Sequence, residues 1–200
     1  MMAAAARALH GIELVVVGAS AGGIEALSLL LADLPPSWRV PVLVVLHLPE
    51  GHDSHLVEVF RHRVAIAVDE ARDKAPIESG TLYFAPPGYH LSVERDACFS
   101  LSCEAPVHYS RPSIDLLMIS AADAYGRRVA GFLLTGANDD GAQGMQRIHQ
   151  RGGLTAVQDP TVAQVPTMPQ AAIDTQAPDF VLPLPELRDL LLQLDAHHAP

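Results

Sequence analysis

The chain has 200 residues, of which 49% are hydrophobic and 18% are charged, and its formal net charge is -10. This composition fits one compact domain. The acidic balance argues against a general nucleic-acid binder, which needs a basic surface to release counterions from phosphates. No apolar run approaches the ~18 residues of a membrane span. The first residues do not show the basic start, apolar core and small-residue cleavage site of a secretion signal. We therefore expect a cytoplasmic protein without membrane insertion.

Strands and helices are predicted to alternate over the first 63 residues. Residues 13–17 (ELVVV) are β-branched and bounded by glycine, which predicts a strand buried on both faces. Residues 40–47 (VPVLVVLH) predict a second strand, and a helix capped by Asp53 or Ser54 follows it. Between the two strands, apolar residues recur at helical spacing until a pair of prolines, at Ile24, Leu27, Leu31 and Leu34.

The middle of the chain is less regular. Four short strand-like runs are separated by Ser-Gly and Pro-Pro-Gly turns, which predicts hairpins at an antiparallel edge; they are residues 64–71, 81–87, 90–95 and 97–104.

Helix and strand alternate again towards the end of the chain. A helix that opens at Pro112 precedes a strand at residues 129–134, and a helix that closes at Gly152 precedes a strand at residues 154–158. An amphipathic helix ends the pattern. We predict a single doubly wound α/β domain with a mostly parallel sheet, helices on both faces and an antiparallel hairpin edge.

The loop after the first strand reads GASAGG and starts at Gly18. A dinucleotide-binding loop needs glycine where this chain has Ser20, and a Walker loop needs a lysine that the segment lacks. The pattern from Gly18 to Gly22 does fit Gly-x-Ser-x-Gly, in which small neighbours let a tight turn present the serine hydroxyl. A helix N-cap is the simpler role for Ser20, so a nucleophile also requires a base and an orienting carboxylate.

Both partners are available at the ends of other predicted strands. His47 closes the second strand, at the sheet edge where an open α/β fold places its ligand crevice. The strand at residues 129–134 runs into TGANDDG, where either Asp139 or Asp140 can orient an imidazole or cap the next helix. A serine, a histidine and an aspartate after three strands favour a catalytic triad.

Metal and disulfide sites are less well supported. His47, His52 and His55 form an H-x4-H-x2-H pattern, but no carboxylate has the HExxH placement of a zinc site. Cys98 and Cys103 are five residues apart, so on a strand their side chains point to opposite faces. We expect neither a metal nor a disulfide, and no cofactor.

Six separated segments resemble, in order, the catalytic domain of the CheB-type chemotaxis receptor methylesterases: GASAGGIEAL, VVLHLPEG, YFAPPGYHL, RPSIDLLM, LLTGANDDGAQGM and TMPQAAI. The resemblance covers roughly residues 12–195 and leaves residues 1–11 as a frayed N-terminus. It implies a serine hydrolase that removes methyl groups from γ-glutamyl esters on the cytoplasmic helices of chemoreceptors, with glutamine deamidation as a second activity. It also selects Asp140 over Asp139 as the carboxylate beside Ser20 and His47.

The residues expected around the oxyanion and the substrate are Ala21, Gly22, Ala137 and Arg111. Ala21 and Gly22 supply backbone N–H groups at the helix start, and Arg111, beside Tyr109, is a candidate substrate contact. Ala21 and Ala137 stand where the family usually has threonine and methionine. No receiver domain is expected in this chain. This implies either regulation by a separate receiver or signalling protein, or that the chain is a fragment or a module of a different signalling system.

Two other functions remain open from the sequence. One is an interaction or anion-sensing module that kept the fold and lost turnover, which the Ala21 and Ala137 changes favour. The other is an esterase that uses Ser20, His47 and Asp140 on a different acyl substrate.

Overall fold

The computed structural model describes residues 11–47, 55–107 and 109–195. Its main element is a seven-stranded sheet in the order β3-β4-β2-β1-β7-β8-β9, in which every pair of neighbours is parallel. The strands are β1 (Leu14–Ala19), β2 (Val42–Leu46), β3 (Ala67–Glu70), β4 (Thr81–Phe84), β7 (Val129–Leu133), β8 (Leu154–Gln158) and β9 (Phe180–Leu182). Because β1 lies between β2 and β7, the loops that follow these three strands emerge side by side.

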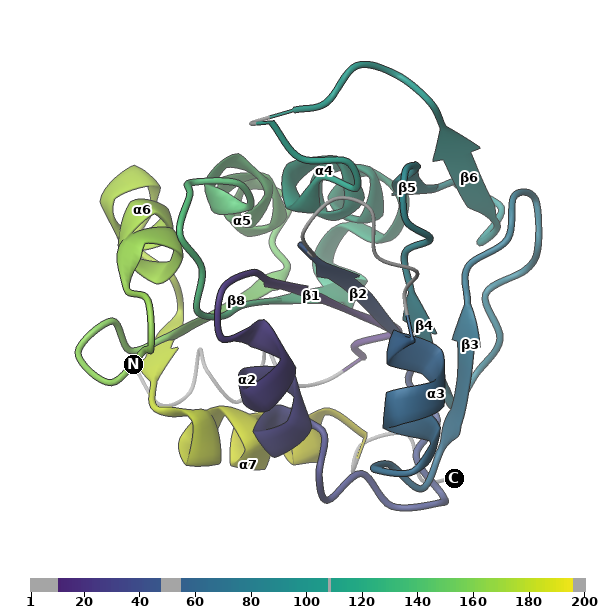
Figure 1. Cartoon of the computed structure of the whole chain (residues 1–200), viewed down its shortest axis with the longest axis horizontal. Coiled ribbons are helices and arrows are strands. Elements are labelled where there is room, and N and C mark those ends of the chain that lie inside the picture. The colour runs from purple at the N-terminus through teal and green to yellow at the C-terminus, as the bar shows by residue number, and fades with distance from the viewer. Residues whose placement is uncertain (1–10, 48–54, 108, 196–200) are drawn as a thin grey trace.

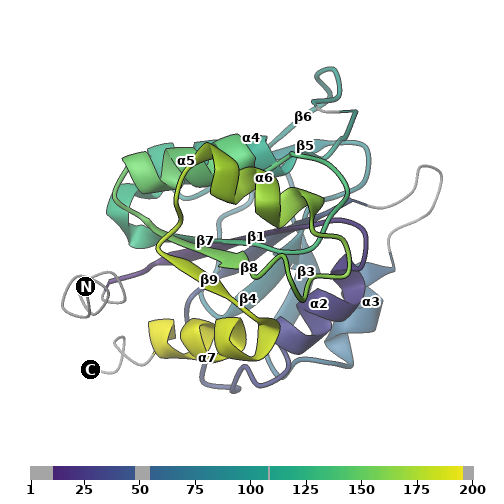
Figure 2. The same ribbon diagram turned by 90° about the vertical axis from the view of Figure 1, so that its left-hand side faces the viewer.

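Helices cover both faces of the sheet, and Figure 2 shows the sheet edge-on between the two layers. One layer contains α2 (Gly23–Leu30), α3 (Leu56–Arg61) and α7 (Leu184–Asp195). The other contains α4 (Ile114–Tyr125), α5 (Ala142–Gln150) and α6 (Thr167–Thr175). A short 3-10 helix, η1 (Gly126–Arg128), joins α4 to β7. The doubly wound, mostly parallel fold is therefore confirmed.

The five inner strands of the sheet are buried on both faces, as a nearly continuous apolar sequence predicts, whereas the edge strands β3 and β9 are partly exposed. In β1, Val15 and Val17 point into the core under α2 and α7, whereas Leu14 and Val16 point into the core under α4 and α5. Successive side chains of a strand alternate between faces, so this one run of residues contributes to both cores.

The antiparallel hairpin is present but does not form an edge of the main sheet. Strands β5 (His90–Val93) and β6 (Phe99–Ser102) form a separate two-stranded sheet that packs beside α4 (Figure 1). The prediction of hairpins for the first two middle runs was wrong, because β3 and β4 pair in parallel. Residues 71–80 lead the chain from the end of β3 back to the edge of the sheet where β4 begins. Turn residues in the sequence show that the chain changes direction, but they do not show whether the strands on either side pair in parallel or antiparallel.

Several boundaries also differ from the prediction. Helix α4 begins at Ile114 with Ser113 as its N-cap, rather than at Pro112. The prediction missed α6 and β9. Ile24 was expected to face the core with Leu27, but its side chain is 44% exposed. Asp53 and Ser54 lie outside the described residues, and no helix in the described ranges is long and apolar enough to cross a membrane.

Candidate functional site

Ser20 directly follows β1 in a turn held by backbone hydrogen bonds. Its N–H donates to the carbonyl oxygen of Thr135 at 3.0 Å, and its own carbonyl accepts from the N–H of Gly23 at 2.7 Å. Gly22 has a φ of 78°, a left-handed conformation that glycine adopts without strain. This conformation turns the chain sharply from β1 into α2 and leaves Ser20 half-buried at the edge of the sheet.

The parallel register brings Ser20 beside His47. Ala19 lies opposite Leu46, so the next residue of each strand continues the same pairing. The N–H of His47 donates to the carbonyl oxygen of Ala19 at 3.0 Å. Both side chains line one cavity of about 600 Å³, which extends over the start of α2.

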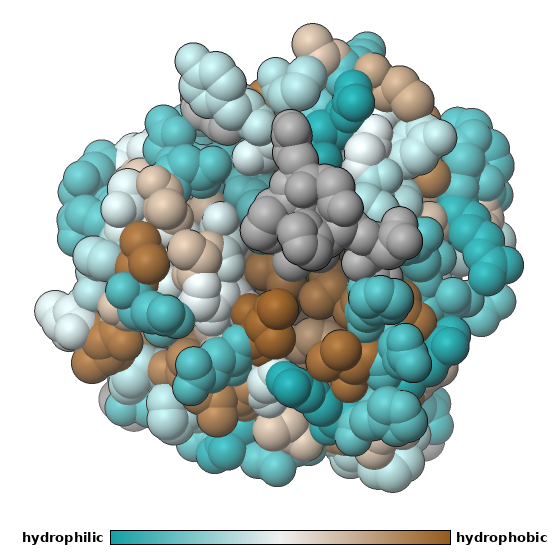
Figure 3. All heavy atoms as spheres, in the orientation of Figure 1, coloured by the Kyte–Doolittle hydropathy of each residue, from teal (hydrophilic) through white to brown (hydrophobic). Residues whose placement is uncertain are grey.

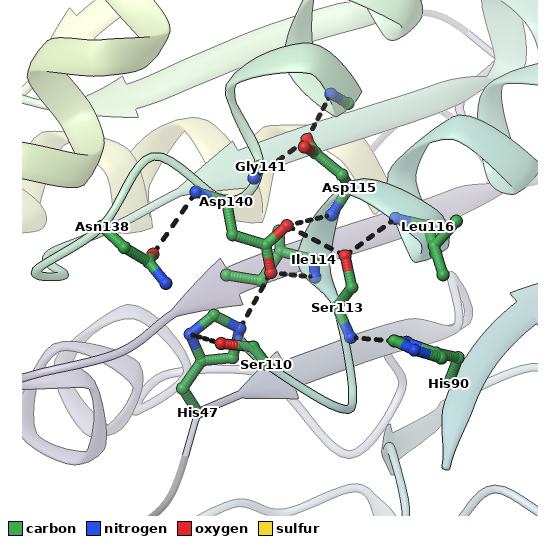
Figure 4. A network of polar contacts seen from close by, with 11 residues as sticks. His47, His90, Ser110, Ser113, Ile114, Asp115, Leu116, Asn138, Asp140 and Gly141 are labelled. Atoms are coloured by element: carbon green, nitrogen blue, oxygen red, sulfur yellow. Dashed lines mark hydrogen bonds and ion pairs between the residues drawn. The ribbon is translucent and has the colours of Figure 1, made fainter. Parts of the chain in front are cut away.

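Asp140 approaches His47 from the far side of β1, after β7. Its carboxylate is fully buried and accepts four hydrogen bonds, as Figure 4 shows. The donors are Nε2 of His47 at 2.9 Å, Oγ of Ser113 at 2.9 Å, and the N–H groups of Ile114 at 2.7 Å and Asp115 at 2.9 Å. The carboxylate thus occupies the N-terminus of α4, where the helix dipole stabilises a negative charge.

Asp115 makes the reciprocal contact with α5. Its side chain is buried near the start of α4 and accepts from the N–H groups of Gly141 at 2.9 Å and Gly144 at 2.7 Å. Asp140 therefore binds the N-terminus of α4 while Asp115 binds the N-terminus of α5. This exchange fixes the two helices and the Asp140 carboxylate relative to one another.

These contacts determine the ionisation of Asp140. Burial by itself raises the pKa of this carboxyl, but hydrogen bonds from His47 and from the N–H groups of Asp115 and Ile114 outweigh it. The pKa of Asp140 therefore lies below its usual value, and the side chain is a carboxylate at neutral pH.

An ionised carboxylate only accepts hydrogen bonds, so Nε2 of His47 carries the proton that Asp140 binds. In the neutral imidazole Nδ1 is then the nitrogen without a proton, and Oγ of Ser110 lies 3.5 Å from it. Within the described residues, the Ser20 hydroxyl forms no hydrogen bond with the imidazole. The structure therefore places a histidine with a buried carboxylate partner beside two serines.

The N–H groups of Ala21 and Gly22 are available at the start of α2. Among the described residues neither donates a hydrogen bond to a protein acceptor, whereas the neighbouring N–H of Gly23 is already used. Two unpaired donors next to Ser20 are suited to an oxyanion.

The remaining predicted site residues lie elsewhere. Ala137 is exposed after β7 and does not line the cavity beside Ser20. Arg111 is exposed and donates to the carbonyl oxygens of Cys103 at 3.1 Å and Glu104 at 3.0 Å, and Tyr109 is fully exposed.

Asp139 is exposed beside Asp140. His52 lies outside the described residues, and those that are described contain no cluster of three metal-binding side chains.

A family model described as CheB methylesterase matches residues 15–191. The chain belongs to the CheB methylesterase family. The family resemblance that the six segments carry is thus confirmed.

Individual members of the CheB methylesterase family cover the chain closely. A Leptospira interrogans protein, provisionally named protein-glutamate methylesterase/protein-glutamine glutaminase, is 41% identical over 93% of this chain and 96% of its own length. An Anaeromyxobacter dehalogenans protein-glutamate methylesterase/protein-glutamine glutaminase is also 41% identical, over 96% of this chain but 56% of its own length. The crystal structure of the Thermotoga maritima CheB methylesterase catalytic domain superposes with a TM-score of 0.87 at 28% identity, over 92% of this chain and 98% of that domain.

Sequence reasoning missed three residues that support this CheB-type site. Ser113 and Asp115 hold the Asp140 loop, and the buried hydroxyl of Thr135 donates to the carbonyl oxygen of Ala21 at 2.9 Å. Ser113 could have been found as an N-cap, because it precedes an apolar helical run. Asp115 and Thr135 gave no such signal, since their partners lie far away in the sequence.

Proposed function

We propose that this chain is a protein-glutamate methylesterase that acts in the cytoplasm on γ-glutamyl methyl esters of chemoreceptor helices. The observation that carries the proposal is the 2.9 Å hydrogen bond between His47 and the buried Asp140. His47 also lines the same cavity as Ser20. Membership of the CheB methylesterase family and the names of the relatives supply the substrate class.

In the first step, Oγ of Ser20 attacks the carbonyl carbon of the ester while His47 takes the hydroxyl proton. The N–H groups of Ala21 and Gly22 stabilise the negative charge on the carbonyl oxygen, and the N-terminus of α2 adds its dipole. His47 then protonates the leaving oxygen, so methanol departs and a γ-glutamyl ester of Ser20 remains.

In the second step, water attacks this ester while His47 takes a proton from it. The proton passes to Oγ of Ser20, and a glutamate γ-carboxyl group is released. Asp140 stays ionised throughout and stabilises the imidazolium. No metal or cofactor takes part in this sequence.

Glutamine deamidation follows from the same chemistry, and the names of the relatives favour it as a second activity. The amide and the ester lead to the same γ-glutamyl-serine intermediate. The leaving group is ammonia instead of methanol, which makes protonation by His47 more important because an amide nitrogen leaves poorly without it.

Proton transfer requires the imidazole nitrogen that does not contact Asp140 to face Ser20. In the structure this nitrogen lies near Ser110 instead. We infer that the imidazole turns toward Ser20 when substrate fills the cavity, because catalytic hydrogen bonds often align only in the substrate complex. Ser20, and not Ser110, has the free N–H groups of Ala21 and Gly22 next to it.

The experiment compares methanol release from a methylated chemoreceptor cytoplasmic fragment by the parent protein, Ser20→Ala and Ser110→Ala. We expect Ser20→Ala to lose about 10³-fold or more in kcat, and Ser110→Ala to stay within a few-fold of the parent. The reverse order would make Ser110 the nucleophile. An inactive, folded parent protein would favour an interaction module, and activity on simple esters alone would favour a different acyl substrate.

A further inference from the structure

The cavity beside Ser20 extends beyond the residues that the reaction needs. It runs along α2 as far as Leu29 and is bounded on other sides by Arg63, which follows α3, and by Gln164. Its volume of about 600 Å³ is within the usual range for a ligand pocket. A methyl ester group fills only a small part of it, so the remainder is available to the chain that carries the ester.

The lining of this extension is apolar. Ile24 is 44% exposed and Leu29 is 51% exposed, and both lie on α2 beside Leu46 at the end of β2. Figure 3 shows apolar side chains gathered in the region between α2 and α3, with hydrophilic residues around them. Grouped apolar side chains next to a reactive centre are typical of a surface that binds part of a substrate.

Arg63 gives this apolar surface a positive charge. Its guanidinium donates a hydrogen bond to Oγ of Ser28 on α2 and lies 5.8 Å from the centre of the Phe60 ring. Within the described residues no carboxylate forms an ion pair with it. Most donors of this guanidinium therefore remain available for an anion.

Glu25 adds a negative charge to the same cavity. It lies in the first turn of α2, whereas Arg63 contacts Ser28 about one turn later. The sign of the charge thus changes along the cavity. A neutral ester is favoured near Ser20 and Glu25, and an acidic side chain is favoured further along, beside Arg63.

We propose that this cavity binds the substrate helix next to the ester, through an apolar side chain on Ile24 and Leu29 and a carboxylate on Arg63. The inference rests on the proposed function and specifies its substrate as an acidic, amphipathic helix. Charge complementarity supports this occupant, because a protein of net charge -10 repels acidic helices at long range and must attract them locally.

The test uses helical peptides that carry one glutamate γ-methyl ester, one leucine, and either Glu or Gln at positions three, four or seven residues from the ester. Methanol release is measured with the parent, Arg63→Gln and Arg95→Gln. Arg95 is the matched control, since it is exposed and does not line the cavity. We expect the parent to prefer the Glu peptide about fivefold in kcat/KM at one spacing, the upper range for an exposed ion pair.

Arg63→Gln is expected to abolish this preference and Arg95→Gln to keep it. An unchanged preference in Arg63→Gln would overturn the inference, as would a parent protein that hydrolyses Glu and Gln peptides equally at every spacing. The same peptides with glutamine in place of the ester are then titrated into Ser20→Ala by fluorescence anisotropy. Equal binding with and without the Arg63→Gln change would contradict the inference even if the parent lacks methylesterase activity.

Discussion

Ser20 and Asp140 follow two neighbouring parallel strands, but the fold supports their side chains in different ways. The Ser20 turn is held by its backbone, and its hydroxyl and the N–H groups beside it face an open cavity. The Asp140 carboxylate is fully buried and accepts hydrogen bonds from four donors. The Ser20 side of the site is therefore open to a substrate, whereas the Asp140 side holds a single carboxylate in a fixed position.

Asp140→Asn should have the largest effect, because it damages both activity and stability. We expect kcat to fall about 10³- to 10⁴-fold, since the amide no longer holds the proton on the correct imidazole nitrogen. The free energy of unfolding should fall by about 1–3 kcal/mol, because buried donors lose their acceptor. Methanol-release kinetics and urea unfolding measure the two quantities.

Ser20→Ala is the companion variant for this comparison. Its kcat should fall about as much as that of Asp140→Asn, while its free energy of unfolding stays within about 0.5 kcal/mol of the parent. If both variants were equally stable, the idea that the carboxylate side is structural as well as catalytic would be wrong.

Asp115→Asn tests the exchange of carboxylates between α4 and α5. We expect kcat to fall about tenfold and the free energy of unfolding to fall by about 1–2 kcal/mol, because the N–H groups of Gly141 and Gly144 both bind Oδ1 of Asp115 and would then bind an uncharged acceptor. Asp123→Asn is the control, since Asp123 lies on the same helix but is partly exposed and pairs with Arg147 and Arg151.

A positioning role for Asp115 is separable from a general loss of stability. Asp115→Asn retains one acceptor oxygen, so it should keep more activity than Asp115→Ala at a temperature where both are folded. Equal kcat for these two variants and the parent would show that the exchange does not position Asp140.

The smallest effect is expected in the pH dependence of stability. The folded pKa of Asp140 is lowered, so its contribution is present above the unfolded value of about 3.9 and is lost as pH falls through the lower folded value. The pKa of Asp123 is also lowered, where hydrogen bonds from Arg151 and Arg147 outweigh its burial, but this carboxylate is 38% exposed. Salt therefore screens Asp123 much more than Asp140.

Urea unfolding between pH 2 and pH 7, at low and high salt, measures both contributions. Asp140→Asn should flatten the acid limb of the stability curve at either salt concentration, whereas Asp123→Asn should do so only at low salt. A salt-sensitive contribution from Asp140 would mean that its carboxylate is open to solvent.

Much of the fold followed from local pattern. The buried runs at β1, β2, β7 and β8 are short, apolar and bounded by turn residues, and this is sufficient to predict strands of a parallel sheet. The α6 and β9 segments were missed because they lack strong periodicity, and the pairing of β3 with β4 was missed because turn residues do not encode strand direction. Ile24 was assigned to the core because helical spacing identifies the apolar face of a helix. It does not show whether another element of the fold covers every residue of that face.

By itself, the sequence determined that serine, histidine and aspartate side chains follow strands that end at one edge of the sheet. It could do so because strand patterns and Gly-x-Ser-x-Gly turns are local properties of the chain. The choice of Asp140 over Asp139 came from the family resemblance, and the contact of Asp140 with His47 agrees with it. Only the tertiary structure decided that Asp115 and Ser113 hold the Asp140 loop, and that Arg63 borders the cavity. These contacts join segments far apart in the sequence, so they depend on how the strands are ordered and how α4 packs on α5.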